Sequence, residues 1–221
     1  MSQYNSSMFS DAVYLFGKIF SSAPIFRNES EELPDGTWVN QKKLAEQVVL
    51  AAFAYLYHKK LIDIVLGERT CWFRKKKTAK VKTLQSTAPD MSGLELVIFP
   101  FDENGRGHTY VHPDMSGLEL VIFSSLRDNS DIYGITERLG PIPWLTSFNP
   151  WGEVLQIVKE NLLQRGILKQ VVKRKILFIT THKYVVNGDI SKAAKQITEL
   201  QKTLKELQSK GELYQQILSD I

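Results

Sequence analysis

Apolar positions repeat with helical spacing in some parts of the chain and form short β-type runs in others. Between residues 153 and 165 they fall on one stripe, which predicts a helix. The stripe consists of Val154, Leu155, Val158 and Leu162. Gly166 stands where a left-handed residue can end this helix. A strand, a basic turn at 173–175 and a second strand then predict a hairpin over 167–186.

The same order, a helix and then a hairpin, is predicted nearer the N-terminus. Residues 40–58 carry a broad apolar face, so we expect a helix that is mostly buried. Residues 60–65 read as a strand, 67–70 as a turn and 71–74 as the start of the return strand, within a basic hairpin that spans 61–82. A shorter apolar helix is predicted over 11–20, followed by a polar loop at 27–36.

The C-terminal segment repeats its apolar positions by threes and fours, as in a heptad. The positions are Ile190, Ala194, Ile197, Leu200, Leu204, Leu207, Tyr214, Leu218 and Ile221. We therefore predict a mainly α fold with small β-hairpins, with one compact helical domain at 1–188 and an amphipathic helix at 189–221. That helix packs on its own domain or forms a coiled-coil contact with a partner, in a homo-oligomer or with another protein.

One eleven-residue stretch occurs twice, residue for residue, at 89–99 and 113–123. Structural repeats diverge in sequence and come in larger numbers, so two identical copies are not a solenoid or a propeller. A recent local duplication and an error in the assembly of the sequence both account for it. In either case only one copy need belong to the core, and we treat the duplicated segment as an insertion in the domain.

Composition narrows the class of protein. With 221 residues, 43% of them hydrophobic, the chain can bury one good core. The single cysteine, Cys71, allows no internal disulfide and indicates a reducing compartment. We find neither a secretory signal nor an apolar run long enough to cross a bilayer. We therefore expect a cytoplasmic protein whose contact with membranes, if any, is peripheral. The net charge of +4 favours phosphate-bearing partners.

Catalytic and metal-binding patterns are missing from the sequence. The histidines are scattered, and His108 and His112 lack the glutamate of a zinc protease motif. Gly105 and Gly107 form a Gly-x-Gly without the third glycine, the preceding strand or the downstream acid of a dinucleotide site. Cys71 has no positioned base in the pattern. We therefore predict no enzymatic activity, no cofactor and no metal.

Three segments, in order, resemble the Golgi phosphoprotein 3-like family. Residues 56–64 are similar to a helix end that runs into a strand of the type Gly-Arg-Ile-Glu-Val. Residues 86–89, followed by the Asp-Met-Ser-Gly-Leu-Glu-Leu of either duplicate, resemble the linker Ala-Pro-x-Gly-Asp-x-Leu-Leu. Residues 158–168, with Phe178, Thr181 and His182, resemble the helix Arg-Glu-Arg-Leu-x-x-x-Gly-Val-Leu and the hairpin after it.

The resemblance implies a peripheral membrane adaptor with a mainly helical fold. Golgi members of the family hold phosphatidylinositol 4-phosphate with one tryptophan and three arginines, and they use the hairpin for membrane insertion and self-association. In this chain Trp38 lies near the tryptophan position, while Val49, Gly152 and Leu155 fall where the arginines would be. The hairpin would span roughly 171–182.

Two sets of candidate site residues follow. The set for lipid or phosphate binding is Trp38, Arg74, Lys75, Lys76, Lys77, Lys80, Lys82, Lys173, Arg174 and Lys175. The set for oligomerisation or membrane insertion is Val171, Val172, Ile176, Leu177 and Phe178.

Three functions are open at this point. The first is a non-catalytic peripheral membrane adaptor or scaffold that binds anionic, phosphoinositide-type headgroups through its basic clusters. The second is a DNA-binding protein with tandem winged-helix-like units, whose basic wings would contact backbone phosphates. The third is a structural subunit of a larger assembly, held through residues 190–221.

Overall fold

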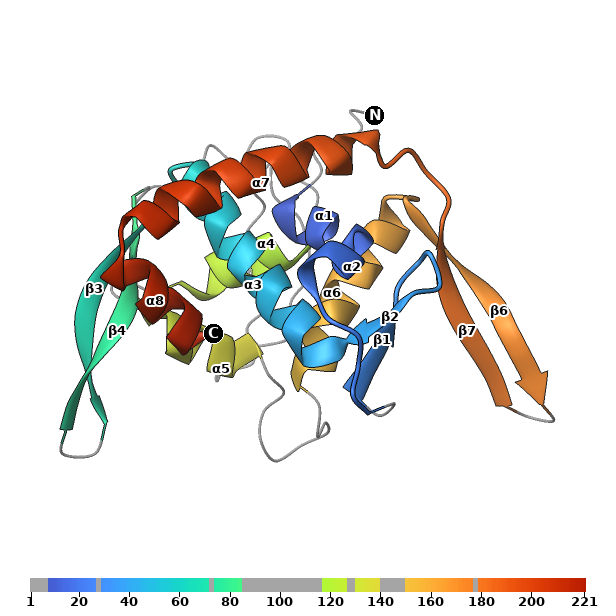
Figure 1. The fold of residues 1–221 in the computed structure, drawn as a ribbon, viewed down its shortest axis with the longest axis horizontal. Helices are drawn as coiled ribbons and strands as arrows, with labels where there is room; N and C mark the ends of the chain where they lie inside the picture. The colour runs from blue at the N-terminus through green and yellow to red at the C-terminus, as the bar shows by residue number, and fades with distance from the viewer. Residues whose placement is uncertain are drawn as a thin grey trace.

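The computed structural model (Figure 1) describes residues 8–26, 29–71, 74–84, 117–126, 130–139, 150–176 and 179–221. The helices are α1 (Phe9–Leu15), α2 (Gly17–Phe20), α3 (Gln41–His58), α4 (Gly117–Ser125), α5 (Ile132–Leu139), α6 (Pro150–Gln164), α7 (Ser191–Ser209) and α8 (Glu212–Asp220). The strands are β1 (Ser30–Glu32), β2 (Trp38–Asn40), β3 (Ile62–Cys71), β4 (Arg74–Thr83), β5 (Ser130–Asp131), β6 (Leu168–Ile176) and β7 (Ile179–Val186).

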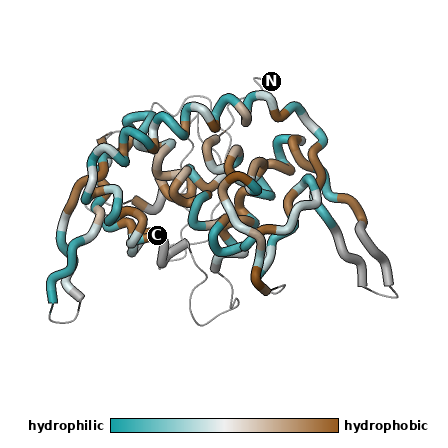
Figure 2. The backbone as a smooth tube through the Cα atoms, viewed as in Figure 1, coloured by the Kyte–Doolittle hydropathy of each residue, from teal (hydrophilic) through white to brown (hydrophobic). Residues whose placement is uncertain are grey.

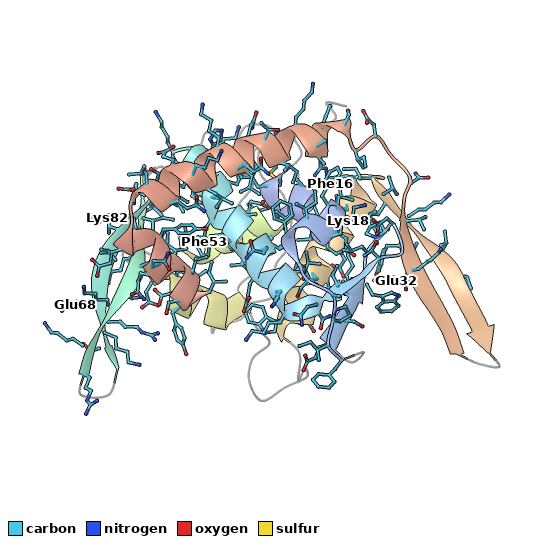
Figure 3. The ribbon with its side chains drawn as sticks, in the orientation of Figure 1. Phe16, Lys18, Glu32, Phe53, Glu68 and Lys82 are labelled. Atoms are coloured by element: carbon cyan, nitrogen blue, oxygen red, sulfur yellow. The ribbon has the colours of Figure 1, made fainter. Side chains whose placement is uncertain are left out.

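Helix α3 is the centre of the fold. Asn40 caps its N-terminus, because the side-chain oxygen accepts the N–H of Lys43 over 2.9 Å. Eleven of its 18 residues are buried, and α1, α4, α6 and α7 pack around it (Figure 1). Phe53 is completely buried and lies in the middle of this helical layer (Figure 3). The mostly buried helix predicted over 40–58 is therefore confirmed.

Helix α6, which was predicted over residues 153–165, also forms. Its apolar stripe is buried, with Val158 and Leu162 completely inaccessible to solvent. Gly166 adopts φ +69°, and the N–H of Ile167 donates to the carbonyl of Leu162 over 3.0 Å. A left-handed glycine with these reversed hydrogen bonds is a common way to end a helix.

Two long antiparallel hairpins project from the helices. Strand β3 pairs with β4 from Ile62↔Thr83 to Cys71↔Arg74, and β6 pairs with β7 from Leu168↔Val186 to Ile176↔Ile179. Both hairpins point to the same side of the molecule, opposite α7 (Figure 1). We call this the hairpin side.

Both predicted turns are wrong in position. Gly67 lies within β3 opposite Thr78, and it fits there because the side chain of Lys80 crosses the space that a Cβ would occupy. In the second hairpin, residues 173–175 lie within β6, where the pairing register shifts between Val172 and Arg174. A β-bulge of this kind accommodates an extra residue without ending the strand.

The prediction of a mainly α fold is also wrong. Among the residues that the structure describes, the fold is mixed, with 56% in helices and 24% in strands. Within the described residues the strands form three antiparallel sheets. Two causes raise the strand content above our expectation: the hairpin strands continue past the predicted turns, and β1 pairs with β2 where we expected a polar loop.

The second copy of the duplicated stretch belongs to the core. Residues 117–123 lie in α4, where Leu118, Leu120 and Ile122 are buried. The first copy, 89–99, lies outside the described residues. The second copy therefore supplies an apolar face that packs on α3 and α6.

The C-terminal segment packs on its own domain as two helices. Gly211 adopts φ +55° between α7 and α8, so the direction of the chain changes there (Figure 1). The buried apolar residues of α7 and α8 are Ala193, Leu200, Leu207, Leu213 and Ile217. Of the predicted heptad positions, Leu200 and Leu207 are thus buried, whereas Ala194 and Leu218 are exposed. Beyond Gly211 the buried positions are Leu213 and Ile217, one residue before the predicted Tyr214 and Leu218. Among the described residues, no helix combines the length and the apolar character that a membrane span requires.

Candidate functional site

The basic cluster of the first hairpin lies on β4. Arg74, Lys75, Lys76 and Lys77 are exposed, as is Lys82, and Lys80 is half-buried. The two halves of this strand differ in burial. Ala79 and Val81, in the half nearer the helices, are buried, whereas residues 74–77, in the half nearer the tip, are exposed to solvent. Lys82 lies near the helices and Glu68 closer to the tip (Figure 3).

Two carboxylates partly offset the positive charge of this cluster. The ammonium of Lys75 forms an ion pair with Glu68 over 3.1 Å, with both side chains mostly exposed. Lys77 pairs with Glu212 on α8, and the hydrogen bond that its ammonium donates to this carboxylate, together with the carboxylate's charge, raises the pKa of Lys77. Arg69 lies instead 3.7 Å from the ring centre of Tyr133. The cluster thus combines six cationic side chains on β4 with two carboxylates that pair with two of them.

The second hairpin carries the other basic cluster. The backbone of Arg174 lies opposite Thr181 and that of Lys175 opposite Thr180, so both belong to the half of the hairpin nearer its tip. Val172 is 60% exposed, Val171 is half-buried, and Ile176 is the last residue of β6. Leu177 and Phe178 lie outside the described residues.

The two hairpins give the molecule an uneven charge distribution. Strands β3, β4, β6 and β7 contain twelve of the chain's 28 Lys and Arg residues and two of its 24 acidic residues. The rest of the chain, with 16 basic and 22 acidic residues, has a net charge of −6. Because both hairpins point to the hairpin side, the positive charge of these strands is concentrated there (Figure 1).

The positions implied by the resemblance do not form one pocket. Trp38 lies on β2 and is 41% exposed, while the two basic clusters belong to two other sheets. Val49 and Leu155, where two of the family's arginines would be, are buried in the core. Gly152 lies in the first turn of α6. The described contacts therefore provide distributed basic surfaces in place of a compact headgroup pocket.

A buried polar cluster, absent from our prediction, connects three helices. Asp11 on α1 accepts hydrogen bonds from Asn161 on α6 over 3.0 Å and from the guanidinium of Arg165. The side chain of Glu119 on α4 accepts the Oγ–H and the N–H of Ser10 over 2.7 and 3.0 Å. Burial, followed by the charge of Asp11, raises the pKa of Glu119 to about 8.

Burial also raises the pKa of Asp11, against the opposing effect of Arg165. Both carboxylates are inaccessible to solvent, so the cluster positions α1, α4 and α6 and offers no surface to a ligand. A second buried group joins β1 to α1 and α6: Glu31 accepts Tyr14 Oη and Lys159 Nζ, each over 3.2 Å. Neither cluster could be predicted from local sequence patterns, because its members are widely separated along the chain.

Within the described residues, no group of histidine, cysteine and acidic side chains is arranged to hold a metal ion. None of the protein-family models, curated proteins and solved structures with which the chain was compared matches it. The resemblance to the Golgi phosphoprotein 3-like family thus stays a prediction, and the class that the fold defines is a helical body with two projecting basic hairpins.

Proposed function

We propose that the protein is a non-catalytic peripheral membrane adaptor that binds anionic, phosphoinositide-type headgroups through its two hairpins. The observation that carries this proposal is the direction of the hairpins. Both extend to one side of a body that is otherwise negatively charged, so a single flat anionic surface can contact both at once. Each Lys or Arg near an anionic leaflet contributes about 1 kcal/mol of attraction.

The order helix then hairpin occurs twice, which also suits the DNA-binding alternative. Helix α3, however, is buried on eleven of its 18 residues and has no polar face free to enter a major groove. Helix α6 likewise directs Val154, Leu155 and Val158 into the core. The hairpins alone could still contact phosphates, so a mobility-shift assay on duplex DNA at low salt should accompany every lipid assay.

The third function, a subunit held through residues 190–221, would need an apolar surface on the last two helices. Leu200 and Leu207 of α7 and Ile217 of α8 are buried within the molecule. Less apolar area is therefore left for a partner than the heptad pattern alone suggested. The size of the purified protein in solution tests this alternative directly.

Flotation with vesicles tests the membrane proposal. The native protein should float with phosphatidylcholine vesicles that contain phosphatidylserine or a phosphoinositide, and should stay behind with phosphatidylcholine alone. The triple variant R74Q/K75Q/K76Q removes three charges, which should cost about 3 kcal/mol, or roughly a hundredfold in partitioning. The matched control is K195Q/K202Q/K205Q, which removes three exposed lysines of α7, on the opposite side.

The control variant should bind anionic vesicles much more strongly than the hairpin variant. Equal recovery of the native protein with neutral and anionic vesicles would contradict the proposal. So would an equal loss of binding in the two triple variants, because net charge alone would then account for it. Binding of DNA but not of vesicles would favour the alternative.

A further inference from the structure

Two neighbouring apolar side chains are unusually exposed for a chain with a well-formed core. Ile25 is 83% exposed and Phe26 is 61% exposed, which places both among the most exposed large hydrophobic residues of the described chain. They stand at the end of the described segment 21–26, which follows α2 directly along the chain. Exposed apolar pairs of this kind commonly mark contact surfaces.

The segment is attached at its start to the N-terminus of α3. The hydroxyl of Ser21 donates to the carbonyl of Asn40 over 2.9 Å, and the N–H of Asn40 donates to the carbonyl of Ser22 over 2.8 Å. At its other end β1 pairs with β2, where Ser30 lies opposite Asn40. Close to the apolar pair, the N–H of Glu29 donates to the carbonyl of Phe26 over 3.2 Å, so the backbone on both sides of the pair is held by hydrogen bonds.

The segment extends to the hairpin side. The segment 21–26 descends from α2 to the side to which both hairpins point, and it lies between them (Figure 1). In the hydropathy view it ends in a strongly hydrophobic stretch at the lower edge of the body (Figure 2). The β3–β4 hairpin, at the other end of the molecule, is mostly hydrophilic in the same view.

We propose that Ile25 and Phe26 form a wedge that inserts into the headgroup region of an anionic bilayer while the two hairpins contact its surface. This inference rests on the proposed function. The charge pattern indicates which partner binds here. An apolar pair flanked by two cationic hairpins is complementary to an anionic bilayer, which has a negatively charged surface and an apolar interior. Stable peripheral attachment generally takes two signals, and an inserted apolar group adds to electrostatic attraction.

Insertion should be visible with a fluorophore at position 26. In a C71S background, F26C is labelled with an environment-sensitive dye and mixed with phosphatidylcholine–phosphatidylserine vesicles. We expect a blue shift, and stronger quenching by nitroxides high on the acyl chains than by an aqueous quencher. The matched control is Q201C with the same dye, at an exposed position of α7 on the opposite side; it should show no shift.

Alongside the dye experiment, the unlabelled native protein and the F26A and I25A variants are compared by flotation with the same vesicles. Each variant should lose about tenfold in partitioning, because one apolar side chain no longer leaves water. If the native protein floats but the dye at position 26 does not shift, the wedge is wrong and the membrane proposal stands. If the native protein does not float, the proposed function itself is wrong. A dye shift that needs no vesicles and grows with protein concentration would assign the pair to a contact between copies and overturn the wedge.

Discussion

Asp220 on α8 accepts two hydrogen bonds from β4, although 142 residues separate it from Thr78. The hydroxyl of Thr78 donates to Oδ2 of Asp220 over 2.9 Å, and the N–H of Ala79 donates to the same oxygen over 2.7 Å. Thr78 is completely buried and Asp220 is 5% exposed. The last helix is therefore attached at the base of the basic hairpin and helps to fix the direction in which that hairpin projects.

The D220A variant should be destabilised by about 1–3 kcal/mol, because it leaves a buried N–H and a buried hydroxyl without an acceptor. Urea unfolding at neutral pH measures the change. D220N is the matched control, since its amide oxygen can still accept one hydrogen bond, and its loss should be smaller. Hydrogen exchange at Ala79 should accelerate in D220A. Unchanged stability together with unchanged exchange would show that the contact does not hold α8 in place.

The sequence was sufficient to predict helices whose apolar residues follow a regular local pattern. The stripe of α6 has the period of a helix, and Gly166 stands directly after it, so both the helix and its end could be predicted. Helix α3 is apolar on most sides, which indicates burial at the centre of a domain. In each case the signal lies within fewer than twenty consecutive residues, where local spacing is decisive.

The hairpins show where local patterns failed. Glycine at 67 and the basic run at 173–175 are typical of turns, yet cross-strand pairing keeps both within strands. The lysine-rich strand β4 has low β propensity and forms because Ala79 and Val81 pack on the core. Contacts such as Asp220 with Thr78, or Asp11 with Asn161, join distant segments, so no window of sequence contains them.

Gly166 gives a prediction that depends only on backbone conformation. It adopts φ +69°, and no atom lies within 4 Å of the position that a Cβ would take. G166A should therefore lose about 1 kcal/mol from left-handed strain alone, without a steric clash. G166N should lose less, because asparagine tolerates this conformation better. Thermal or urea unfolding would measure whether stability decreases from the native protein to G166N and then to G166A. An alanine variant as stable as the native protein would contradict the prediction.

Lys159 and Glu31 form an ion pair with little access to solvent. Their charged atoms are 3.2 Å apart, and the side chains are 11% and 10% exposed. K159M should be destabilised by about 3–5 kcal/mol, because it leaves the carboxylate of Glu31 buried without its cation. In K159M/E31Q the charge is absent and Tyr14 can still donate to the amide oxygen, so part of the loss should be recovered. A double-mutant cycle from urea unfolding measures the coupling; additive losses would show that the two side chains do not interact energetically.

Glu119 should make the protein less stable as the pH rises through neutrality. Burial raises its pKa from 4.5 to about 8, so over that range the native state keeps a proton that the unfolded chain releases. The free energy of unfolding therefore falls between about pH 4.5 and pH 8, by at most about 1.4 kcal/mol per pH unit, and this contribution levels off above pH 8. E119Q mimics the protonated side chain and can still pair with the hydroxyl and the N–H of Ser10. Its advantage over the native protein should be negligible near pH 4.5 and should grow steadily towards pH 8.

Urea unfolding at pH 5, 6, 7 and 8 provides the measurement, with E199Q, on the exposed side of α7, as the matched control. Other groups titrate in both proteins, so the difference between E119Q and the native chain reports Glu119 together with its charge coupling to Asp11. The E199Q curve should run parallel to the native one. If the E119Q curve is also parallel to it, Glu119 is ionised in the native state over this range, and the buried carboxyl does not hold the proton assigned to it.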